Sequence, residues 1–355
     1  MSRFIQLHVL TSYPPANLNR DDTGRPKSAL VGGAVRLRVS SQSLKRAWRT
    51  SELFEGALAG HLGTRTKAMG KEVFKALKAG GISDKLAREW AKQIAQQFGK
   101  PKSEKKTEND EDLEIEQLAH FSPEEREAID ALVKRLVEQR DAPPTSDELH
   151  LLVKPRRAVD IAMFGRMLAD AAEFNVEAAV QVSHAITVHK APVEDDYFSA
   201  VDDLNTREQT GAGHIGERGY GAGLFYLYLC IDRELLKENL GGDDALTQRA
   251  LAALVEAVAK VAPTGMQNSF ASRAYASYVL AEKGRQQPRS LVQAFYKPVT
   301  AYGEERDMLT QAVNALEKRR ENFDKVYGAC ADARCALDVE QGTGSMQELV
   351  AFVSE

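Results

Sequence analysis

Within the segment 36–49, RLRVSSQSLKRAWR, the hydrophobic spacing changes from every second residue to every third or fourth. Its first part alternates as a strand does, with apolar side chains on one face and polar side chains on the other. The apolar face holds Leu37 and Val39, and the polar face holds Arg36, Arg38 and Ser40. The second part has the spacing of an amphipathic helix whose N-cap is Ser41 or Ser43. The apolar face of that helix holds Leu44, Ala47 and Trp48. A strand that runs directly into a helix is therefore predicted here.

The same segment is strongly basic. Lys45 and Arg49 lie four apart on the predicted helix, where like charges repel by roughly 0.2–0.5 kcal/mol unless an anion binds. The amide groups at the helix start and their partial positive charge also suit a phosphate. The first fifty residues carry a net charge of +7, so the remainder carries −11 of the chain's total of −4. We therefore expect a local surface for a polyanion, and a solvated amphipathic helix is the alternative.

The composition limits the class of protein. With 355 residues, of which 43% are hydrophobic, the chain can bury an ample core, which argues against global disorder. It has no run of about eighteen apolar residues and no small-residue cleavage pattern near its start, so we expect a soluble, cytoplasmic protein. The three cysteines form no CxxC pair, which fits a reducing compartment and predicts no zinc site. We expect no cofactor.

The order of the predicted elements indicates an α+β fold. Residues 3–10 alternate as a strand, and a loop rich in Pro, Gly, Asn and Asp follows at 12–34. After the basic strand and helix come strands at 178–190 and 224–231, a helix at 244–262, a strand at 274–282 and a mostly helical tail at 288–355. Apart from two insertions, this is the strand, helix, strand, strand, helix, strand order of the ferredoxin-like fold, which RNA-recognition modules share. The order alone is weak evidence, because that fold serves many functions.

Two insertions interrupt that order. Residues 58–175 are predicted to be helical, with a charged flexible connector at 100–114. Helix start signals in this insertion are found at Ser83, Ser122 and Thr145. A glycine-rich segment between the strands at 178–190 and 224–231 is predicted to protrude as a hairpin or loop. Its apolar side chains either pack on their own domain or wedge against bases or a neighbouring subunit. They are Tyr197, Phe198, Val201 and Ile215.

Other motifs give little sign of catalysis. Gly211–Gly216, GAGHIG, has dinucleotide-binding spacing but lacks the helix that such a site needs. The histidines near the later strands have neither metal-ligand spacing nor the order of a catalytic triad. They are His184, His189 and His214. Asp21 and Asp22 suit a turn before Gly24, and a magnesium site beside a phosphate is the alternative.

Eight short segments carry a family resemblance. They are FIQLHVL (4–10), LNRDD (18–22), GG (32–33), VSSQSLKRAWR (39–49), VDIAMFGRM (159–167), HAIT (184–187), YFSAVDDL (197–204) and GHIG (213–216). In this order, over roughly two thirds of the chain, they resemble the CasC-type backbone subunit of type I-E CRISPR surveillance complexes, known as Cascade. Residues 60–150 resemble the family only in being helical.

The resemblance implies a hand-like subunit that polymerises head to tail along guide RNA. It implies a modified RNA-recognition-motif palm at 1–57, 176–190 and 223–355, helical fingers at 58–175 and a thumb β-hairpin at 191–222. The residues that would hold the guide RNA are Arg20, Lys27, Arg38, Ser40, Gln42, Lys45, Arg46, Arg49 and Arg166. The thumb would displace a guide base at regular intervals, and the apolar contacts for this would be Met167, Tyr197, Phe198, Val201 and Ile215.

The resemblance also implies a role in antiviral defence without catalysis by this chain. Base pairing between guide and target DNA would read the sequence, while the protein follows the RNA backbone. Other Cascade subunits would complete the complex, and a recruited helicase-nuclease would cut the target. Two rivals are a backbone subunit that cleaves RNA with Asp21 or Asp22, and a repeat-RNA processing ribonuclease with His8 as its base.

Overall fold

The computed structural model describes residues 2–102, 110–200, 214–300 and 307–355. The chain forms two compact units. The first unit comprises Met1–Ala57, Gln181–Arg233 and Leu251–Glu355, and the second comprises Leu58–Val180 and Glu234–Ala250. None of the helices in the described part of the chain has the length and apolar content needed to cross a membrane.

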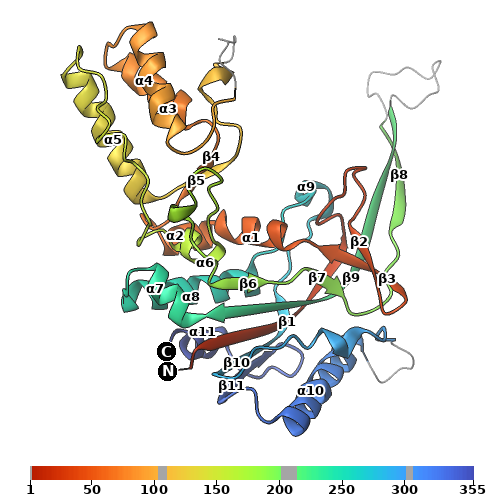
Figure 1. The fold of residues 1–355 in the computed structure, drawn as a ribbon. Coiled ribbons are helices and arrows are strands. Elements are labelled where there is room, and N and C mark those ends of the chain that lie inside the picture. The colour runs from red at the N-terminus through yellow and green to blue at the C-terminus, as the bar shows by residue number, and fades with distance from the viewer. Residues whose placement is uncertain (1, 103–109, 201–213, 301–306) are drawn as a thin grey trace, which may run out of the picture. The chain divides into compact units, whose positions relative to one another are not determined.

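The first unit is built on an antiparallel sheet in the order β11-β10-β1-β9-β7-β3-β2, with β8 paired to β9 (Figure 1). The strands are β1 (Phe4–Ala16), β2 (Ser28–Val31), β3 (Ala34–Val39), β7 (Ala185–Thr187), β8 (Glu194–Ala200), β9 (His214–Asp232), β10 (Ala276–Gly284) and β11 (Ala333–Asp338). The expected loop at 12–34 is therefore too long, because β1 runs to Ala16 and β2 begins at Ser28.

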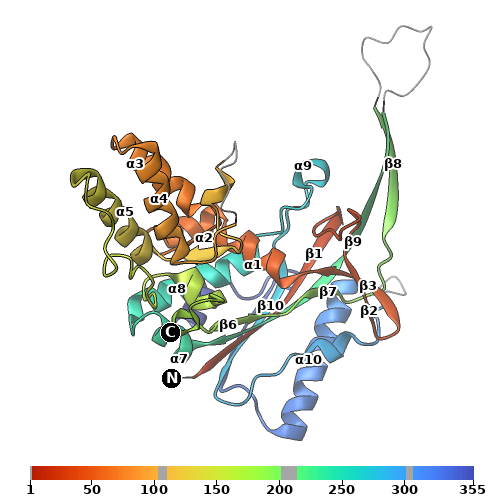
Figure 2. The ribbon, with the colours of Figure 1, turned by 45° about the horizontal axis from the view of Figure 1, so that its top comes forward.

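Helices cover both faces of this sheet (Figure 2). The helices of the first unit are α1 (Ser41–Arg49), α2 (Glu52–Ala57), α8 (Asp244–Lys260), η3 (Val292–Phe295), α10 (Met308–Tyr327), α11 (Met346–Ser354) and α9 (Gln267–Phe270). Of these, α9 stands clear of the sheet (Figure 1), and the first residues of α8 belong to the second unit. On one face Trp48 of α1 and Val258 of α8 approach the sheet, and on the other Leu316 of α10 packs in its core. The tail expected to be mostly helical also contributes β11 at the sheet edge.

Because both faces are covered, β1 is buried on both sides. Its alternation of apolar and polar residues does not mark a solvent-exposed face, since Gln6 and His8 are as buried as Ile5 and Leu7. The polar side chains are satisfied internally. Gln6 Oε1, for example, accepts hydrogen bonds from the Tyr228 hydroxyl at 2.8 Å and from a backbone amide.

The second unit is mainly helical. Its elements are β4 (Thr64–Thr66), α3 (Met69–Ala79), α4 (Asp84–Gln96), η1 (Glu111–Leu113), β5 (Ala119–Phe121), α5 (Pro123–Glu138), α6 (Val159–Phe164) and η2 (Ala172–Phe174), with β6 (Val180–Val182) and α7 (Arg233–Asn239) at the unit boundaries. Two predicted start signals are confirmed, because Ser83 caps α4 and Ser122 forms a capping box with Glu125 at α5. At Thr145 the same contacts with Glu148 close only a turn, so the third signal is wrong.

The predicted connector at 100–114 is also partly wrong. Residues 103–109 lie outside the described residues, but Asp112 is buried and accepts hydrogen bonds from Arg88 at 2.7 Å. Lys92 lies 3.0 Å from the other oxygen of the same carboxylate. A charged residue thus anchors this segment to α4, an arrangement that a composition argument cannot distinguish from a solvated connector.

Candidate nucleic-acid interface

The strand β3 runs directly into α1 at Ser40, as the hydrophobic spacing predicted. Ser40, not Ser41 or Ser43, is the N-cap, because its hydroxyl accepts from the Ser43 amide at 3.3 Å. The Ser40 amide in turn donates to Asn19 Oδ1 at 2.9 Å. Within the described part of the chain the amides of Ser41 and Gln42 have no hydrogen-bond partner. Two donors and the positive helix end therefore remain for an anion.

The loop that carries Arg20 and Lys27 is fixed against β3. The Lys27 amide donates to Asn19 O at 2.8 Å, and the Arg38 amide donates to Lys27 O at 2.8 Å. Asn17 Nδ2 donates at 3.0 Å both to Gly24 O within the loop and to Gly219 O on β9. The loop is thus held to β3 and to β9, so its cations are carried on a constrained backbone.

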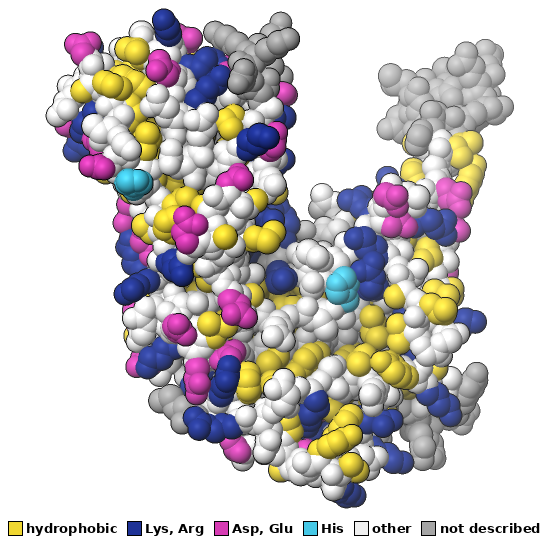
Figure 3. All heavy atoms as spheres, viewed as in Figure 1, with side chains coloured by type: hydrophobic (Ala, Val, Ile, Leu, Met, Phe, Trp, Pro, Cys, Tyr) yellow, Lys and Arg dark blue, Asp and Glu magenta, His cyan; other side chains and the backbone are white. Residues whose placement is uncertain are grey.

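Three of the predicted cations surround His184, which precedes β7. Arg38 donates from its guanidinium to His184 Nδ1 at 2.7 Å. Burial lowers the pKa of His184, and the positive charges of Arg38, Lys27 and Lys45 lower it further. The geometry therefore favours a neutral imidazole with its proton on Nε2. Figure 3 shows Lys and Arg side chains gathered beside a histidine on this face.

This cluster predicts a response to polyanions. Because positive charge adds to burial in lowering the pKa of His184, phosphates bound to Lys27, Arg38 and Lys45 should raise that pKa. NMR titration of the imidazole with and without single-stranded RNA measures the shift. An uncharged peptide nucleic acid of the same sequence is the control, and a pKa that RNA leaves unchanged would contradict the cluster as an anion site.

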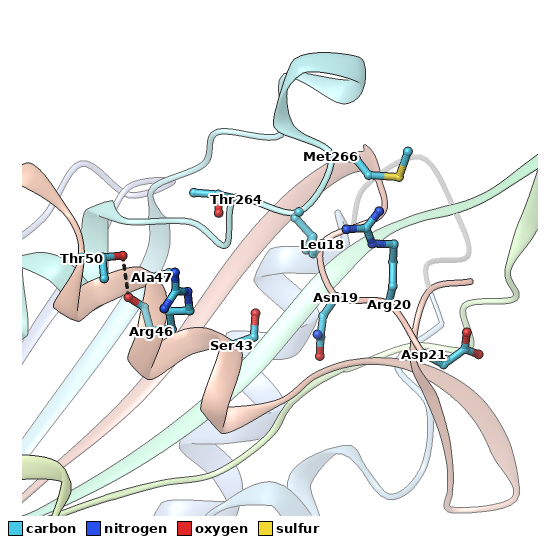
Figure 4. A pocket seen from close by; sticks show the side chains of 11 residues that line it. Leu18, Asn19, Arg20, Asp21, Ser43, Arg46, Ala47, Thr50, Thr264 and Met266 are labelled. Atoms are coloured by element: carbon cyan, nitrogen blue, oxygen red, sulfur yellow. Dashed lines mark hydrogen bonds between the residues drawn. The ribbon is translucent and has the colours of Figure 1, made fainter. Parts of the chain in front are cut away.

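Further along α1 the predicted side chains line the outer surface. Gln42 and Arg46 are exposed, and Lys45 and Arg49 are half-buried. Arg46 lines an open cavity of about 560 Å³ whose other walls are the 18–21 loop and the segment 264–266. Figure 4 shows Arg46 and Ser43 reaching from α1 and Arg20 from the loop. The fold therefore brings side chains predicted to bind a nucleic-acid backbone, from two separate segments of the sequence, onto one surface.

Arg36 departs from the expected charged face of the strand. Its side chain is fully buried and donates to Thr187 O at 2.9 Å and to Phe295 O at 2.8 Å. Burial lowers its pKa. Arg36 therefore joins β3 to β7 and to the η3 segment, and only Arg38 of the two strand arginines faces the candidate site.

The expected phosphate contact at Arg166 is contradicted by its surroundings. Its side chain is 1% exposed and paired with the buried Glu125 at 2.8 Å. The same guanidinium also donates to Val153 O at 2.7 Å and Phe174 O at 3.0 Å. Arg166 therefore ties the end of α6 to α5 within the second unit. Sequence pattern alone does not distinguish such a buried arginine from an exposed one.

The strands β8 and β9 form the predicted protruding hairpin, and they separate its apolar side chains. Phe198 pairs with Gly216, and the Arg218 guanidinium lies over the Phe198 ring at 4.5 Å. Tyr197 and Ile215 lie on the other face by register and are 68% and 56% exposed. The expected thumb contacts are thus divided between two faces. Val201 lies outside the described residues.

Glycines at the base of the hairpin allow its own chain to pack closely. A Cβ at Gly221 would lie 2.6 Å from Leu37 Cδ1, and one at Gly223 would lie 2.7 Å from His189 Nε2. These glycines therefore serve internal packing. The end of the GAGHIG motif, His214–Gly216, lies in β9 and opens no helix, which argues against a dinucleotide site.

Met167 belongs to the second unit. Its side chain is 81% exposed and borders a small cavity, of about 100 Å³, that Leu118 also lines.

The basic residues Arg135 and Arg157 of the same unit form ion pairs, Arg135 with Glu148 and Arg157 with Glu127.

Two candidates of the catalytic alternatives, Asp21 and His8, make internal hydrogen bonds, and Asp22 is exposed. Asp21 Oδ1 accepts from the Thr23 amide at 2.9 Å and from the Arg25 amide at 3.0 Å, which makes a turn. A hydrogen bond from the Thr23 hydroxyl is the main cause of the lowered pKa of Asp21. His8 is fully buried, with Nδ1 2.9 Å from the Tyr226 hydroxyl. Among the described residues no group of His, Cys, Asp or Glu could hold a metal ion.

A helix-covered antiparallel sheet with cations and helix-start amides at one strand–helix junction defines an α+β protein with a site suited to polyanions. The chain belongs to the family of CT1975-like proteins, whose model matches residues 5–352. No curated protein matches the sequence.

Solved structures resemble this chain over nearly its whole length. One, described as "CRISPR RNA-guided surveillance complex, pre-nicking", is 29% identical with a TM-score of 0.85, over 99% of this chain and 100% of that one. Another, described as "CRISPR RNA-guided surveillance complex", is 26% identical with a TM-score of 0.74, over 99% of both chains.

Proposed function

We propose that this chain is the backbone subunit of a type I-E CRISPR surveillance complex and binds the guide RNA. The observation that carries the proposal is the gathering of Lys27, Arg38 and Lys45 around His184, beside the helix-start amides of α1. The likeness to chains of RNA-guided surveillance complexes over the full length supports it.

The topology supports an RNA-recognition-type palm. The strands β10-β1-β9-β7 are adjacent, and α1 and α8 follow β1 and β9 in the chain, which is the connectivity of the ferredoxin-like fold. In this proposal residues 58–175, which lie in the second unit, are the fingers insertion, and the β8–β9 hairpin is the thumb. Copies of the chain assemble head to tail in the cytoplasm, together with other Cascade subunits.

The proposed contacts position the guide without reading it. The cations and the polar groups of the β3–α1 junction hold phosphates, which carry no sequence information. They are Arg20, Lys27, Arg38, Ser40, Gln42, Lys45, Arg46 and Arg49. Base pairing with target DNA then supplies specificity. The thumb displaces guide bases at regular intervals through Tyr197 and Ile215 on one face and Phe198 on the other, with Met167 and Val201 as further contacts.

We further propose that the chain does not cleave nucleic acid and that a recruited helicase-nuclease cuts the target. The use of Asp21 as a turn acceptor supports this, because a carboxylate that already accepts from Thr23 and Arg25 is poorly placed to bind a metal ion. The burial of His8 argues against its use as a base in repeat-RNA processing.

Co-expression of the full chain with a CRISPR array and the other subunits tests the proposal. We expect purified particles that contain guide RNA and a row of copies of this chain in micrographs, and no cleavage of complementary RNA with Mg²⁺. Particles that lack RNA would contradict the binding function. Periodic RNA cleavage that is lost on Asp21→Ala or Asp22→Ala would instead establish the RNA-cleaving alternative.

A further inference from the structure

A second cavity lies at the C-terminal end of α10. It is lined by the segment 286–289, which follows β10, and by side chains of α10 together with Gly328 and Cys330. Both segments belong to the first unit, and α10 covers the face of the sheet opposite to α1 (Figure 1). The volume of about 340 Å³ is within the usual range, about 300–1,000 Å³, of sites for small molecules.

The two walls of this cavity are fixed to the central strand β1 and to each other. Gln6 of β1 accepts from the Arg289 amide at 2.8 Å and donates to Cys330 Sγ at 3.5 Å. The Cys330 amide donates to Asp324 Oδ1 at 3.4 Å, and the Cys330 thiol donates to Gln287 O at 3.7 Å. The cavity is therefore preformed, as small-molecule sites usually are.

Aromatic side chains make up one wall. Phe323 and Tyr327 lie one turn apart on α10, and their rings stack with centroids 5.9 Å apart and planes inclined by 29°. Tyr327 is 81% exposed, so most of its surface is open to contact. Pro288 adds an apolar surface from the other segment. A flat aromatic ring fits these walls, because aromatic rings gain from stacking beyond the area they bury.

The positive charge in the lining is already balanced. Arg289 pairs with Glu282, and its guanidinium lies 3.5 Å from Asp324. The same two carboxylates pair with Arg334, so two negative groups face two positive ones. An anionic ligand would therefore gain little from Arg289, and a cationic ligand would be repelled by its guanidinium. This arrangement favours a neutral ligand.

Two exposed glutamines supply hydrogen-bonding groups. Gln286 and Gln287 both line the cavity, and each side-chain amide carries an acceptor oxygen and a donor nitrogen. A ligand group that both donates and accepts, such as a carboxamide, can pair with either of them. The walls thus match an aromatic ring and a neutral amide group.

We propose that this cavity binds a small, neutral aromatic carboxamide, with its ring against Phe323 and Tyr327 and its amide group on Gln286 or Gln287. The site goes beyond the proposed function, because none of these residues belongs to the β3–α1 junction. Since α10 and α1 cover opposite faces of the sheet, RNA and the small ligand should bind independently.

A matched series of ligands tests the charge argument on the full chain. Benzamide, benzoate and benzamidine share one ring and differ in charge. Ligand-observed NMR titrations should give benzamide a dissociation constant lower than either charged ligand by roughly threefold or more. Cyclohexanecarboxamide, which has no aromatic ring, should also bind more weakly than benzamide. Equal affinity for the whole series, or no binding of benzamide, would overturn the proposal.

A variant at an exposed position locates the site. Tyr327→Ala removes one ring face and should weaken benzamide binding by roughly two- to tenfold. Tyr275→Ala, at another exposed tyrosine of the same unit, is the matched control and should bind benzamide as the wild-type chain does. Unchanged benzamide affinity in Tyr327→Ala would overturn the site. The same variant should bind single-stranded RNA with wild-type affinity, so this test and that of the proposed function give separate answers.

Two measurements on the unaltered chain complete the test. Light-activated 4-azidobenzamide should cross-link to the peptides that contain residues 286–289 or 323–330, and cross-links only to other peptides would contradict the assignment. N-acetylphenylalanine amide carries the ring on a peptide backbone. Tighter binding of that compound than of benzamide would assign the cavity to an aromatic side chain of a partner protein and overturn the small-molecule site.

Discussion

The double variant Lys45→Ala with Arg49→Ala should bind guide RNA on the order of 100- to 10,000-fold more weakly at low salt. Each charge-assisted contact contributes about 1.5–3 kcal/mol, and two are removed. The slope of log affinity against log salt should fall by roughly 1.4 to 2 units, because each lost phosphate contact removes about 0.7 to 1. The loss should be similar for all RNA sequences, since phosphates are common to them.

A matched variant separates this effect from the loss of charge alone. Lys318→Ala with Lys325→Ala removes two exposed cations from α10, in the same unit. Filter binding or fluorescence anisotropy over a salt series should give this control the wild-type slope. If the salt slope fell by the same amount in both double variants, the affinity would come from the overall charge of the chain. The β3–α1 junction would then not be the RNA-binding site.

The largest expected effect on stability lies at Glu282 of β10. Its fully buried carboxylate contacts His8 at 3.2 Å, Arg334 at 2.8 Å and also Arg289. Glu282→Gln removes the buried counter-charge and leaves Arg289 and Arg334 with Asp324 alone, at 3.5 and 2.6 Å. Breaking a buried pair costs about 3–5 kcal/mol, and the remaining carboxylate places the expected loss at the lower end. We expect the Tm of the first unit to fall by roughly 10 °C, measured by calorimetry. Glu340→Gln, at an exposed position, is the control and should leave the Tm unchanged.

The same cluster predicts a loss of stability in acid. Burial lowers the pKa of His8, although Glu282 acts to raise it. Burial alone would raise the pKa of Glu282, but hydrogen bonds from His8 and Arg289 hold it well below its usual range. Both groups therefore bind protons more readily when unfolded, so stability present above pH 6.5 should decline as the pH falls, by up to about 1.4 kcal/mol per pH unit for each group.

The His8→Gln variant isolates the histidine. Glutamine can still donate to Glu282 and accept from Tyr226, but it does not titrate. Its unfolding free energy should therefore change less between pH 6.5 and 5 than that of the wild-type chain, while the decline below pH 4.5 that is due to Glu282 remains. A variant with the wild-type slope between pH 6.5 and 5 would show that His8 is charged in the folded protein.

The elements that the sequence predicted well are those set by local patterns. The switch of spacing at 36–49 and the serine caps at Ser83 and Ser122 each depend on residues a few positions apart, and the structure contains the corresponding strand and helices. The order of the major strands and helices follows from the same kind of signal. Thr145 shows its limit, because correct capping chemistry did not extend into a helix.

The residues whose positions the sequence did not predict correctly are held by contacts with distant parts of the chain. Arg36 lies in a segment that was predicted to be a basic surface, and Arg166 was assigned to the guide RNA by the family resemblance. Both are buried, Arg36 against carbonyl groups and Arg166 against Glu125 from distant segments. The segment 264–266, which lines the cavity beside Arg46, gave no signal in the sequence, since its position depends on the close approach of Gly265 to the 17–18 backbone. His184 could have been found from its place at the strand start, but its ring of cations comes from three other elements.

The strand β9 has a mechanical consequence. It continues without interruption from the hairpin pairing with β8 into the middle of the sheet, where β1 pairs with it through Asp232. No loop separates the two parts, so the hairpin base has no flexible joint about which to swing. A pull on the hairpin along β9 would load the hydrogen bonds of the β1–β9 ladder together, in shear. The arm is therefore suited to carry tension between neighbours along a bound strand.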